Sequence, residues 1–294
     1  MPKITCYGEV LWDVFHHHQK VGGAPLNVAL RLQSFEHDVA MISSVGNDEL
    51  GKDLLKYMTD NGLDTRLVPI TNDFKTGQVQ VTLNDTGSAS YTIDFPAAWD
   101  NIQLTAKAIE AAKTSNAFVF GSLAARSKVS RKTLLELLPH ANYKVFDLNL
   151  RPPHYTKELL IDLMHKADFI KFNDEELYEA SGYLGSKHRS LEQNMHFVSQ
   201  KTNAKHICVT KGNHGAVLLY NGKCYYNSGY FIKVADTVGA GDSFLAALIS
   251  RLLNKANPQE AIDFACAVGA MVAQGEGANP VLSPLDIASF MHPV

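Results

Sequence analysis

Residues 236–243 read D-T-V-G-A-G-D-S and combine two carboxylates with a run of small residues. Gly239, Ala240 and Gly241 let the backbone turn sharply and bring its N–H groups close to an anion. The apolar side chains behind them follow helical spacing, so we predict a helix that begins at Asp242. Because the unpaired N–H groups and the dipole of a helix N-terminus attract negative charge, this turn is a predicted anion site.

Asp242 could take part in chemistry or only in helix formation. Asp is common at N-cap and first-turn positions, where it stabilises a helix without any further role. A second acid before the turn, Asp236, and the phosphate-sized gap between the two acids favour a chemical role. The helix dipole would keep Asp242 ionised, and a carboxylate beside a bound phosphate can accept the proton of an attacking hydroxyl group.

The same residues, continued to Phe244, resemble the D-T-x-G-A-G-D-x-F signature of the ribokinase-like carbohydrate kinases, the PfkB family. The resemblance implies that Asp242 is the catalytic base. It also implies that Gly239, Ala240 and Gly241 form the anion hole for the phosphoryl group that ATP donates. Other motifs extend the resemblance over nearly the whole chain.

The composition agrees with a cytoplasmic enzyme. The chain has 294 residues, of which 46% are hydrophobic, enough for a sizeable core. The net charge of −3, with charges mixed along the chain, does not suggest binding to nucleic acid or to a membrane surface. The four cysteines lack metal-ligand spacing, which suits a reducing compartment. We find no signal peptide and no apolar run long enough to span a bilayer.

Apolar, β-branched runs alternate with helical patterns along most of the chain. The expected strands are residues 4–8, 39–46, 117–122, 144–150, 169–173 and 206–210. The expected helices are residues 25–35, 51–61, 105–113, 131–138, 157–166 and 191–202. Such an alternation predicts an α/β fold with a mostly parallel sheet covered on both faces. With the resemblance, it implies a single ribokinase-like three-layer α/β/α domain over residues 1–294.

Two segments, at about 13–22 and 75–98, interrupt the alternation. Residues 77–83 and 90–95 alternate apolar and polar side chains around a turn at 84–87, which predicts a hairpin with one exposed face. The first of the two segments is expected to be irregular. In the resembling family such segments form a small β-sheet lid over the sugar, and a homodimer through the lid is a further expectation.

Residues near the first strand are candidates for sugar binding. Gly22 and Gly23 precede a helix that contains Asn27, an arrangement that is also typical of an ordinary loop-to-helix junction. It resembles the family's G-G-x-x-x-N element, in which the glycines act as a lid hinge and the Asn contacts sugar hydroxyls. Asp13 follows the first strand, where ligands gather in open α/β sheets, and a carboxylate suits a vicinal diol. Its alternative role is that of a solvated loop residue.

Asn173 and Glu176 follow another strand with N-x-x-E spacing, which places them near each other on a first helical turn. An acidic first turn is also normal for a helix N-terminus. In the resembling family the same spacing organises water-bound Mg²⁺ and the phosphates, and Mg²⁺ needs few protein carboxylates. The resemblance also implies a monovalent cation, K⁺, near Asp236 and residues 275–278, although the family pattern is met only approximately in that segment.

Residues 209–215 resemble the family's V-T-x-G-x-x-G loop, which lies along the ATP phosphates. The resemblance implies that Thr210, Gly212 and Gly215 contact the nucleotide. Lys211 departs from the commoner Leu. Its ammonium group either adds a cation near the nucleotide or points to solvent.

Two further stretches bear on the identity of the sugar. Residues 121–126 and 147–151 resemble the G-S-L-A-x-R and D-x-N-x-R motifs of bacterial fructokinases. They imply D-fructose, phosphorylated at carbon 6, with Arg151 near the sugar. A competitor is 2-keto-3-deoxygluconate, whose carboxylate would need a cation such as Arg151, and a ribokinase is a further alternative. If Arg151 faces the sugar pocket, the sugar acid gains support. If Arg151 pairs with Asp147 or lies outside the pocket, the neutral ketose is favoured.

Two other classes of protein remain as alternatives. A non-catalytic sugar or nucleotide sensor could retain the fold, although sensors tend to lose the base and Asp242 is present. A dinucleotide oxidoreductase lacks support, because no G-x-G-x-x-G follows the first strand.

Overall fold

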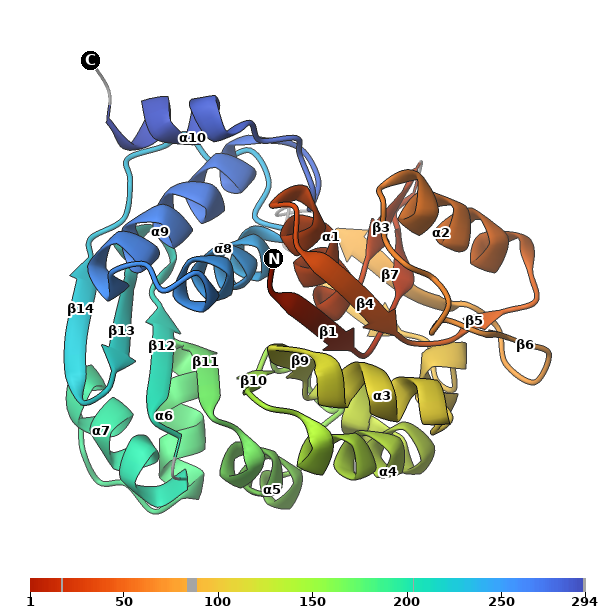
Figure 1. The fold of residues 1–294 in the computed structure, drawn as a ribbon, viewed down its shortest axis with the longest axis horizontal. Coiled ribbons are helices and arrows are strands. Elements are labelled where there is room, and N and C mark those ends of the chain that lie inside the picture. The colour runs from red at the N-terminus through yellow and green to blue at the C-terminus, as the bar shows by residue number, and fades with distance from the viewer. Residues whose placement is uncertain (17, 84–88, 203, 293–294) are drawn as a thin grey trace.

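A computed structural model describes residues 1–16, 18–83, 89–202 and 204–292. Within these residues, eight strands form a central sheet in the order β14-β13-β12-β11-β10-β9-β1-β4 (Figure 1). Their bounds are β1 Lys3–Tyr7, β4 Asp38–Ile42, β9 Ala117–Gly121, β10 Lys144–Asp147, β11 Phe169–Asn173, β12 His206–Thr210, β13 Ala216–Tyr220 and β14 Lys223–Asn227. The strands from β4 to β12 are parallel, and β13 is antiparallel to both neighbours. The predicted mostly parallel sheet is confirmed, with a final hairpin that was not predicted.

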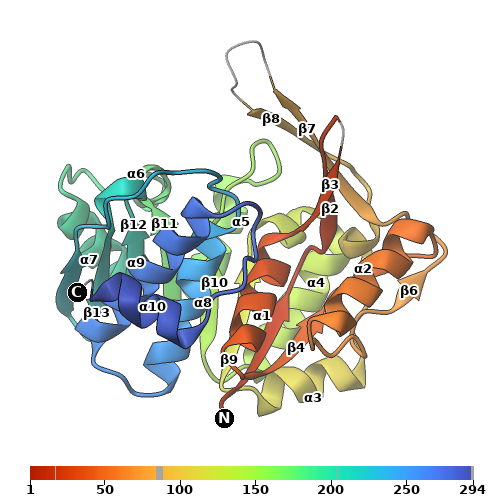
Figure 2. The same cartoon turned by 90° about the horizontal axis from the view of Figure 1, so that it is seen from above.

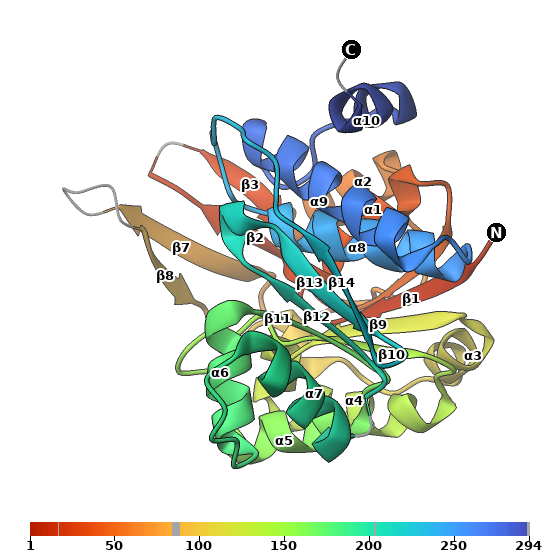
Figure 3. The ribbon, with the colours of Figure 1, turned by 90° about the vertical axis from the view of Figure 1, so that its left-hand side faces the viewer.

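Helices cover both faces of this sheet, as Figure 3 shows. One layer contains α1 Ala24–Ser34, α2 Glu49–Asp60, α8 Ala240–Leu253, α9 Pro258–Gln274 and α10 Pro284–Met291. The other contains α3 Ala106–Thr114, α4 Lys128–Leu137, α5 Lys157–Lys166, α6 Asp174–Tyr183 and α7 Leu191–Thr202. Strand β9 is buried on both sides: Val119 packs into the first layer, and Phe118 and Phe120 into the second. The three-layer α/β/α architecture is therefore confirmed.

A second, smaller sheet projects from one side of the molecule (Figure 2). It contains β2 Leu11–Val14, β3 Gln19–Gly22, β7 Gly77–Leu83 and β8 Ala89–Ile93, in the order β3-β2-β7-β8. We call it the lid sheet. The segment expected to be irregular thus contains an antiparallel strand pair, because residues 11–14 and 19–22 hydrogen-bond to each other. The turn predicted at 84–87 lies outside the described residues. Strands β5 Val45–Gly46 and β6 Ile70–Thr71 form a separate short pair.

Helix α8 begins earlier than its sequence pattern suggested. Gly239 is the N-cap residue, with a left-handed φ of 74°, and Ala240 is the first helical residue. Asp242 therefore lies in the first turn and does not open the helix. The predicted start was wrong because Ala240 and Gly241, two small residues of the turn, already belong to the helix. No helix in the described part of the chain is both long enough and apolar enough to cross a membrane.

Candidate active site

The turn before α8 packs tightly against a second loop. A Cβ atom on Gly239 would lie 2.5 Å from the Cβ of Ala278, so a side chain at this left-handed position would collide with that loop. The carboxylate of Asp236 accepts hydrogen bonds from the backbone N–H groups of Val238 (3.0 Å) and Gly277 (3.1 Å). Burial opposes ionisation of Asp236, but these N–H groups and Lys20 lower its pKa overall. Asp236 thus joins the turn to the neighbouring loop.

Asp242 is held by a chain of two amides. The Nδ2 of Asn27 on α1 donates to its Oδ2 at 2.8 Å, and the Nδ2 of Asn279 donates to the Oδ1 of Asn27 at 2.9 Å. Burial and the charge of Asp147 raise the pKa of Asp242 to about 6, while Asn27, Lys171 and Arg151 oppose the rise. The carboxylate is therefore ionised near neutral pH, and it is a stronger base than an ordinary Asp. Both properties suit a general base.

Lys171 is a functional candidate that the motifs did not reveal. Its Nζ lies 2.9 Å from Oδ1 of Asp147, and both side chains are under 10% exposed, at 8% and 6%. The same Nζ lies 3.7 Å from the position that a Cβ atom on Gly241 would take, so the ammonium group borders the anion turn. Burial favours the neutral amine, but Asp147, Glu176 and Asp242 raise the pKa of Lys171 overall. The signal in the sequence was a lone Lys inside the apolar strand F-I-K-F-N.

Glu176 and Asn173 form a capping box at the start of α6. Asn173 accepts a hydrogen bond from the N–H of Glu176 at 2.7 Å, and Glu176 accepts one from the N–H of Asn173 at 2.8 Å. The other carboxylate oxygen of Glu176 accepts the N–H of Leu150 at 2.8 Å. Asn173 and Glu176 therefore stabilise the N-terminus of α6. Burial raises the pKa of Glu176 above its ordinary value, although Lys171 lowers it.

These groups fit a magnesium ion that is bound through water. Each oxygen of Glu176 keeps a lone pair beyond the backbone hydrogen bond, and Oδ2 of Asp147 is buried without a partner. Within the described residues, no group of three or more His, Cys, Asp or Glu side chains could hold a metal directly. Mg²⁺ keeps several waters in most protein sites, so few carboxylates are sufficient.

Asp13 lies on the lid sheet and within electrostatic reach of the anion turn. Gly22 makes room for it, because a Cβ atom at Gly22 would collide with Oδ2 of Asp13. Burial raises the pKa of Asp13 to about 6; Asp242 and Asp236 add to the rise, and Arg151 and Lys20 oppose it. Residues from both ends of the chain are thus brought to one site.

The backbone at Gly23 explains the paired glycines. Gly23 is the N-cap residue of α1 at φ 108°, and a Cβ atom there would lie 2.5 Å from the carbonyl oxygen of Glu9. Glu9 is a second residue that the motifs did not reveal. It is buried directly after β1, its Oε2 has no partner, and burial raises its pKa to about 7. Its signal was an acid at the carboxyl end of an apolar strand.

Arg151 does not pair with Asp147, which binds Lys171 instead. Its side chain is exposed and donates to the carbonyl of Leu150 at 3.0 Å. Its positive charge lowers the pKa of both Asp13 and Asp242.

The predicted nucleotide loop follows β12. Thr210 is the register partner of Asn173 on β11, so the two predicted nucleotide segments leave the sheet side by side. Gly215 adopts φ 76°, and a Cβ atom there would collide with the carbonyl of Asn227. Gly212 is exposed and Lys211 is half-buried. The structure thus brings the two segments together.

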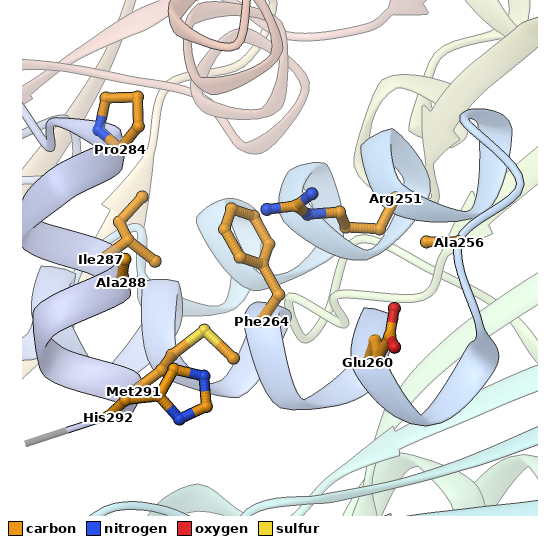
Figure 4. A pocket seen from close by; sticks show the side chains of 9 residues that line it. All are labelled: Arg251, Ala256, Glu260, Phe264, Pro284, Ile287, Ala288, Met291 and His292. Carbon is orange, nitrogen blue, oxygen red and sulfur yellow. The ribbon is translucent and has the colours of Figure 1, made fainter.

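Two hollows of the surface lie away from these residues. One, of about 250 Å³, lies between α10 and the helices α8 and α9 (Figure 4). Arg251 and Phe264 line it, and the guanidinium carbon of Arg251 lies 3.8 Å from the centre of the Phe264 ring. The other, of about 400 Å³, lies at the amino ends of β1 and β4. Neither is lined by a charged residue of the anion turn, and we assign no catalytic role to them.

A mostly parallel sheet with helices on both faces, a small sheet beside it, and a tight turn that leads into the N-terminus of α8 are features of the ribokinase-like fold. Residues 2–284 match the sequence pattern of the pfkB family carbohydrate kinases, so the chain belongs to that family.

Relatives support the assignment over nearly the whole chain. Fructokinase-1 of Oryza sativa subsp. japonica is 27% identical over 280 residues, which span 89% of this chain and 84% of the relative. A fructokinase of Escherichia coli is 26% identical over 276 residues, 89% of this chain and 88% of the relative. A double mutant of a Vibrio cholerae O395 fructokinase, solved in its fructose, ADP and potassium ion bound form, superposes with a TM-score of 0.85 at 24% identity, covering 99% of both chains.

Proposed function

We propose that this chain is an ATP-dependent sugar kinase whose substrate is D-fructose. The observation that carries the proposal is Asp242, a base with a pKa of about 6, held by Asn27 beside an anion turn and a buried Lys171. Phosphoryl transfer needs mainly positioning and neutralisation of charge, and these groups supply both.

The proposed reaction begins when Asp242 accepts the proton of a primary sugar hydroxyl. The hydroxyl oxygen then forms a bond to the γ-phosphorus of ATP, and the bond between that phosphorus and the bridging oxygen of ADP breaks. The N–H groups of Gly239–Gly241 and the ammonium group of Lys171 stabilise the negative charge of the phosphoryl group. Bound Mg²⁺ would supply further neutralisation through waters held by Glu176. Asn173, Thr210, Gly212 and Gly215 line the proposed nucleotide side.

Fructose is supported by the names of the relatives and by the motifs at 121–126 and 147–151. The identities of 26–27% leave room for another sugar. Arg151 favours 2-keto-3-deoxygluconate as the second candidate, because its charge acts on Asp13 instead of pairing with Asp147. A sugar acid would bind that guanidinium group through its carboxylate.

Release of ADP in the presence of Mg²⁺ should be compared for fructose, ribose and 2-keto-3-deoxygluconate. We expect the largest kcat/KM with fructose. A tenfold preference for the sugar acid, about 1.4 kcal/mol of transition-state stabilisation, would overturn the fructose assignment and leave the kinase assignment intact. The variant Arg151→Met distinguishes the two substrates further. It should lower kcat/KM for 2-keto-3-deoxygluconate far more than kcat/KM for fructose.

Several expectations accompany this proposal. A homodimer through the lid sheet, a cytoplasmic location, and contacts of Asp13, Gly22, Gly23 and Asn27 with the sugar remain predictions. Asn27 also has a positioning role, because its side chain already binds Asp242 and Asn279. The K⁺ that the resemblance implies near Asp236 is not part of this proposal, because the ammonium group of Lys20 already pairs with that carboxylate.

A further inference from the structure

Lys20 connects the lid sheet to the anion turn. It lies on β3, and its Nζ is 3.4 Å from Oδ2 of Asp236, which is 216 residues away in the sequence. The stem of the same side chain passes over the second loop, since its Cδ lies 3.9 Å from the position of a Cβ atom on Gly277. The ammonium group also lies over the ring of Phe15, 5.8 Å from the ring centre. Lys20 is therefore held between the lid sheet and the two loops that Asp236 joins.

Lys20 also faces the predicted sugar-binding acid. Asp13 on β2 is its direct register partner across the antiparallel pair, and directly opposed residues project from the same face of a sheet. The ammonium group thus lies on the face of the lid sheet that carries Asp13, and it forms an ion pair with the first acid of the anion turn. The two side chains of that pair are 34% and 23% exposed, so solvent screens them only in part.

We propose that Lys20 is a built-in cation that replaces a monovalent metal ion at Asp236 and couples the position of the lid sheet to the anion turn. An ammonium group is a compact point charge, as a potassium ion is. Both oxygens of Asp236 already have partners: Oδ2 accepts from Lys20 and from the N–H of Gly277, and Oδ1 accepts from the N–H of Val238. A second cation beside Lys20 would be repelled by it. The proposal rests on the proposed kinase function only for its kinetic consequences.

The test compares the wild type with Lys20→Met, Lys20→Arg and a control, Lys166→Met, in KCl, NaCl and tetramethylammonium chloride. Lys166 is a suitable control because it forms an ion pair with Asp162 on α5 and is similarly exposed, at 38%. The first measurement is thermal unfolding without substrates. We expect K⁺ to raise the Tm of Lys20→Met above its value in tetramethylammonium, and to have no such effect on the other three proteins.

The second measurement is turnover, with ADP quantified directly by chromatography so that no coupling enzyme responds to the cation. The wild type, Lys20→Arg and the control should be insensitive to the choice of cation. Lys20→Met should be about tenfold slower without K⁺ and should recover with it, a coupling of ordinary size for two linked sites. The loss should fall on kcat more than on the KM for the sugar.

A wild type that requires K⁺ as strongly as Lys20→Met would overturn the proposal, as would a Lys20→Met protein with neither a Tm nor a turnover response to K⁺. The Tm comparison does not depend on catalysis. An absence of turnover in every protein would therefore count against the kinase assignment, and the K⁺-specific shift in Tm would still decide the role of Lys20.

Discussion

Asp242→Asn should slow catalysis and stabilise the fold at the same time. The variant keeps the size of the side chain and the acceptor for Asn27, but it cannot take a proton. Loss of a general base costs about 10²–10⁴-fold in rate. In the wild type, kcat/KM should fall as the pH drops below about 6, because burial and Asp147 raise the pKa of Asp242 to that value and the protonated carboxyl is no base.

The effect on stability follows from the same pKa. Its rise from an ordinary 3.8 to about 6 corresponds to at most about 3 kcal/mol. A carboxyl group with a raised pKa contributes stability that is present below pH 4, and this contribution is lost as the pH rises through about 6. Asn never ionises. The variant should therefore be more stable than the wild type at pH 8, by about 1–3 kcal/mol after allowance for partial exposure, and the difference should vanish near pH 4.

Urea unfolding of both proteins at pH 4 and pH 8 measures this difference, and ADP release measures the rate. The matched control is Asp286→Asn, because Asp286 occupies the same third position of α10 that Asp242 occupies in α8. Asp286 is exposed and only forms a capping box with Ser283, the N-cap residue of α10. The control should keep its activity. An Asp242→Asn protein with near-wild-type turnover, or one less stable than the wild type at pH 8, would refute the assignment of Asp242 as an ionised, partly buried base.

Three other variants test the rest of the site. Asp13→Ala should raise the KM for the sugar strongly while the KM for ATP changes little; an unchanged sugar KM would remove Asp13 from the substrate side. Lys171→Met should lower kcat and, by leaving Asp147 buried and unpaired, destabilise the fold by about 3–5 kcal/mol; adding Asp147→Asn should restore stability but not kcat, and restored kcat would show that Lys171 is only structural. Gly239→Ala should lower both the Tm and kcat, because the left-handed backbone and Ala278 leave no space for a Cβ atom; wild-type values of both would contradict the packing of this turn.

Local patterns predicted the elements of the core well. The bounds of β11, β12, α5 and α7 agree with those expected, because each is an apolar or amphipathic run that ends at a clear change of pattern. The start of α8 was misplaced because small residues carry little signal for helix or turn. The β13–β14 hairpin was not predicted, although Asn221 and Gly222, the two residues between its strands, are a strong sequence signal for a two-residue hairpin turn.

The site was predicted through its motifs, whereas the ion pairs within it were not. The anion turn is a single short segment, and Asn173 and Glu176 lie within one helical turn of each other. Spacing alone therefore predicts each of these two motifs. Lys171 pairs with Asp147 on the next strand, and Lys20 pairs with Asp236 across the whole fold. Such partners depend on strand register and on how the lid sheet sits, which no short window of sequence contains. The sequence gives only an indirect sign of such an ion pair, namely a charged residue such as Lys171 within an otherwise apolar strand.

The most direct test of the central claim is the detection of sugar phosphate by mass spectrometry after incubation of the protein with ATP, Mg²⁺ and fructose, with Asp242→Asn in parallel. The account predicts that the wild type forms sugar phosphate and ADP in equal amounts, and that the variant binds ATP but forms almost no product. Tight binding of sugar and ATP without any phosphorylated sugar, tested also with ribose and 2-keto-3-deoxygluconate, would contradict it and would identify the chain as a sensor on a kinase fold.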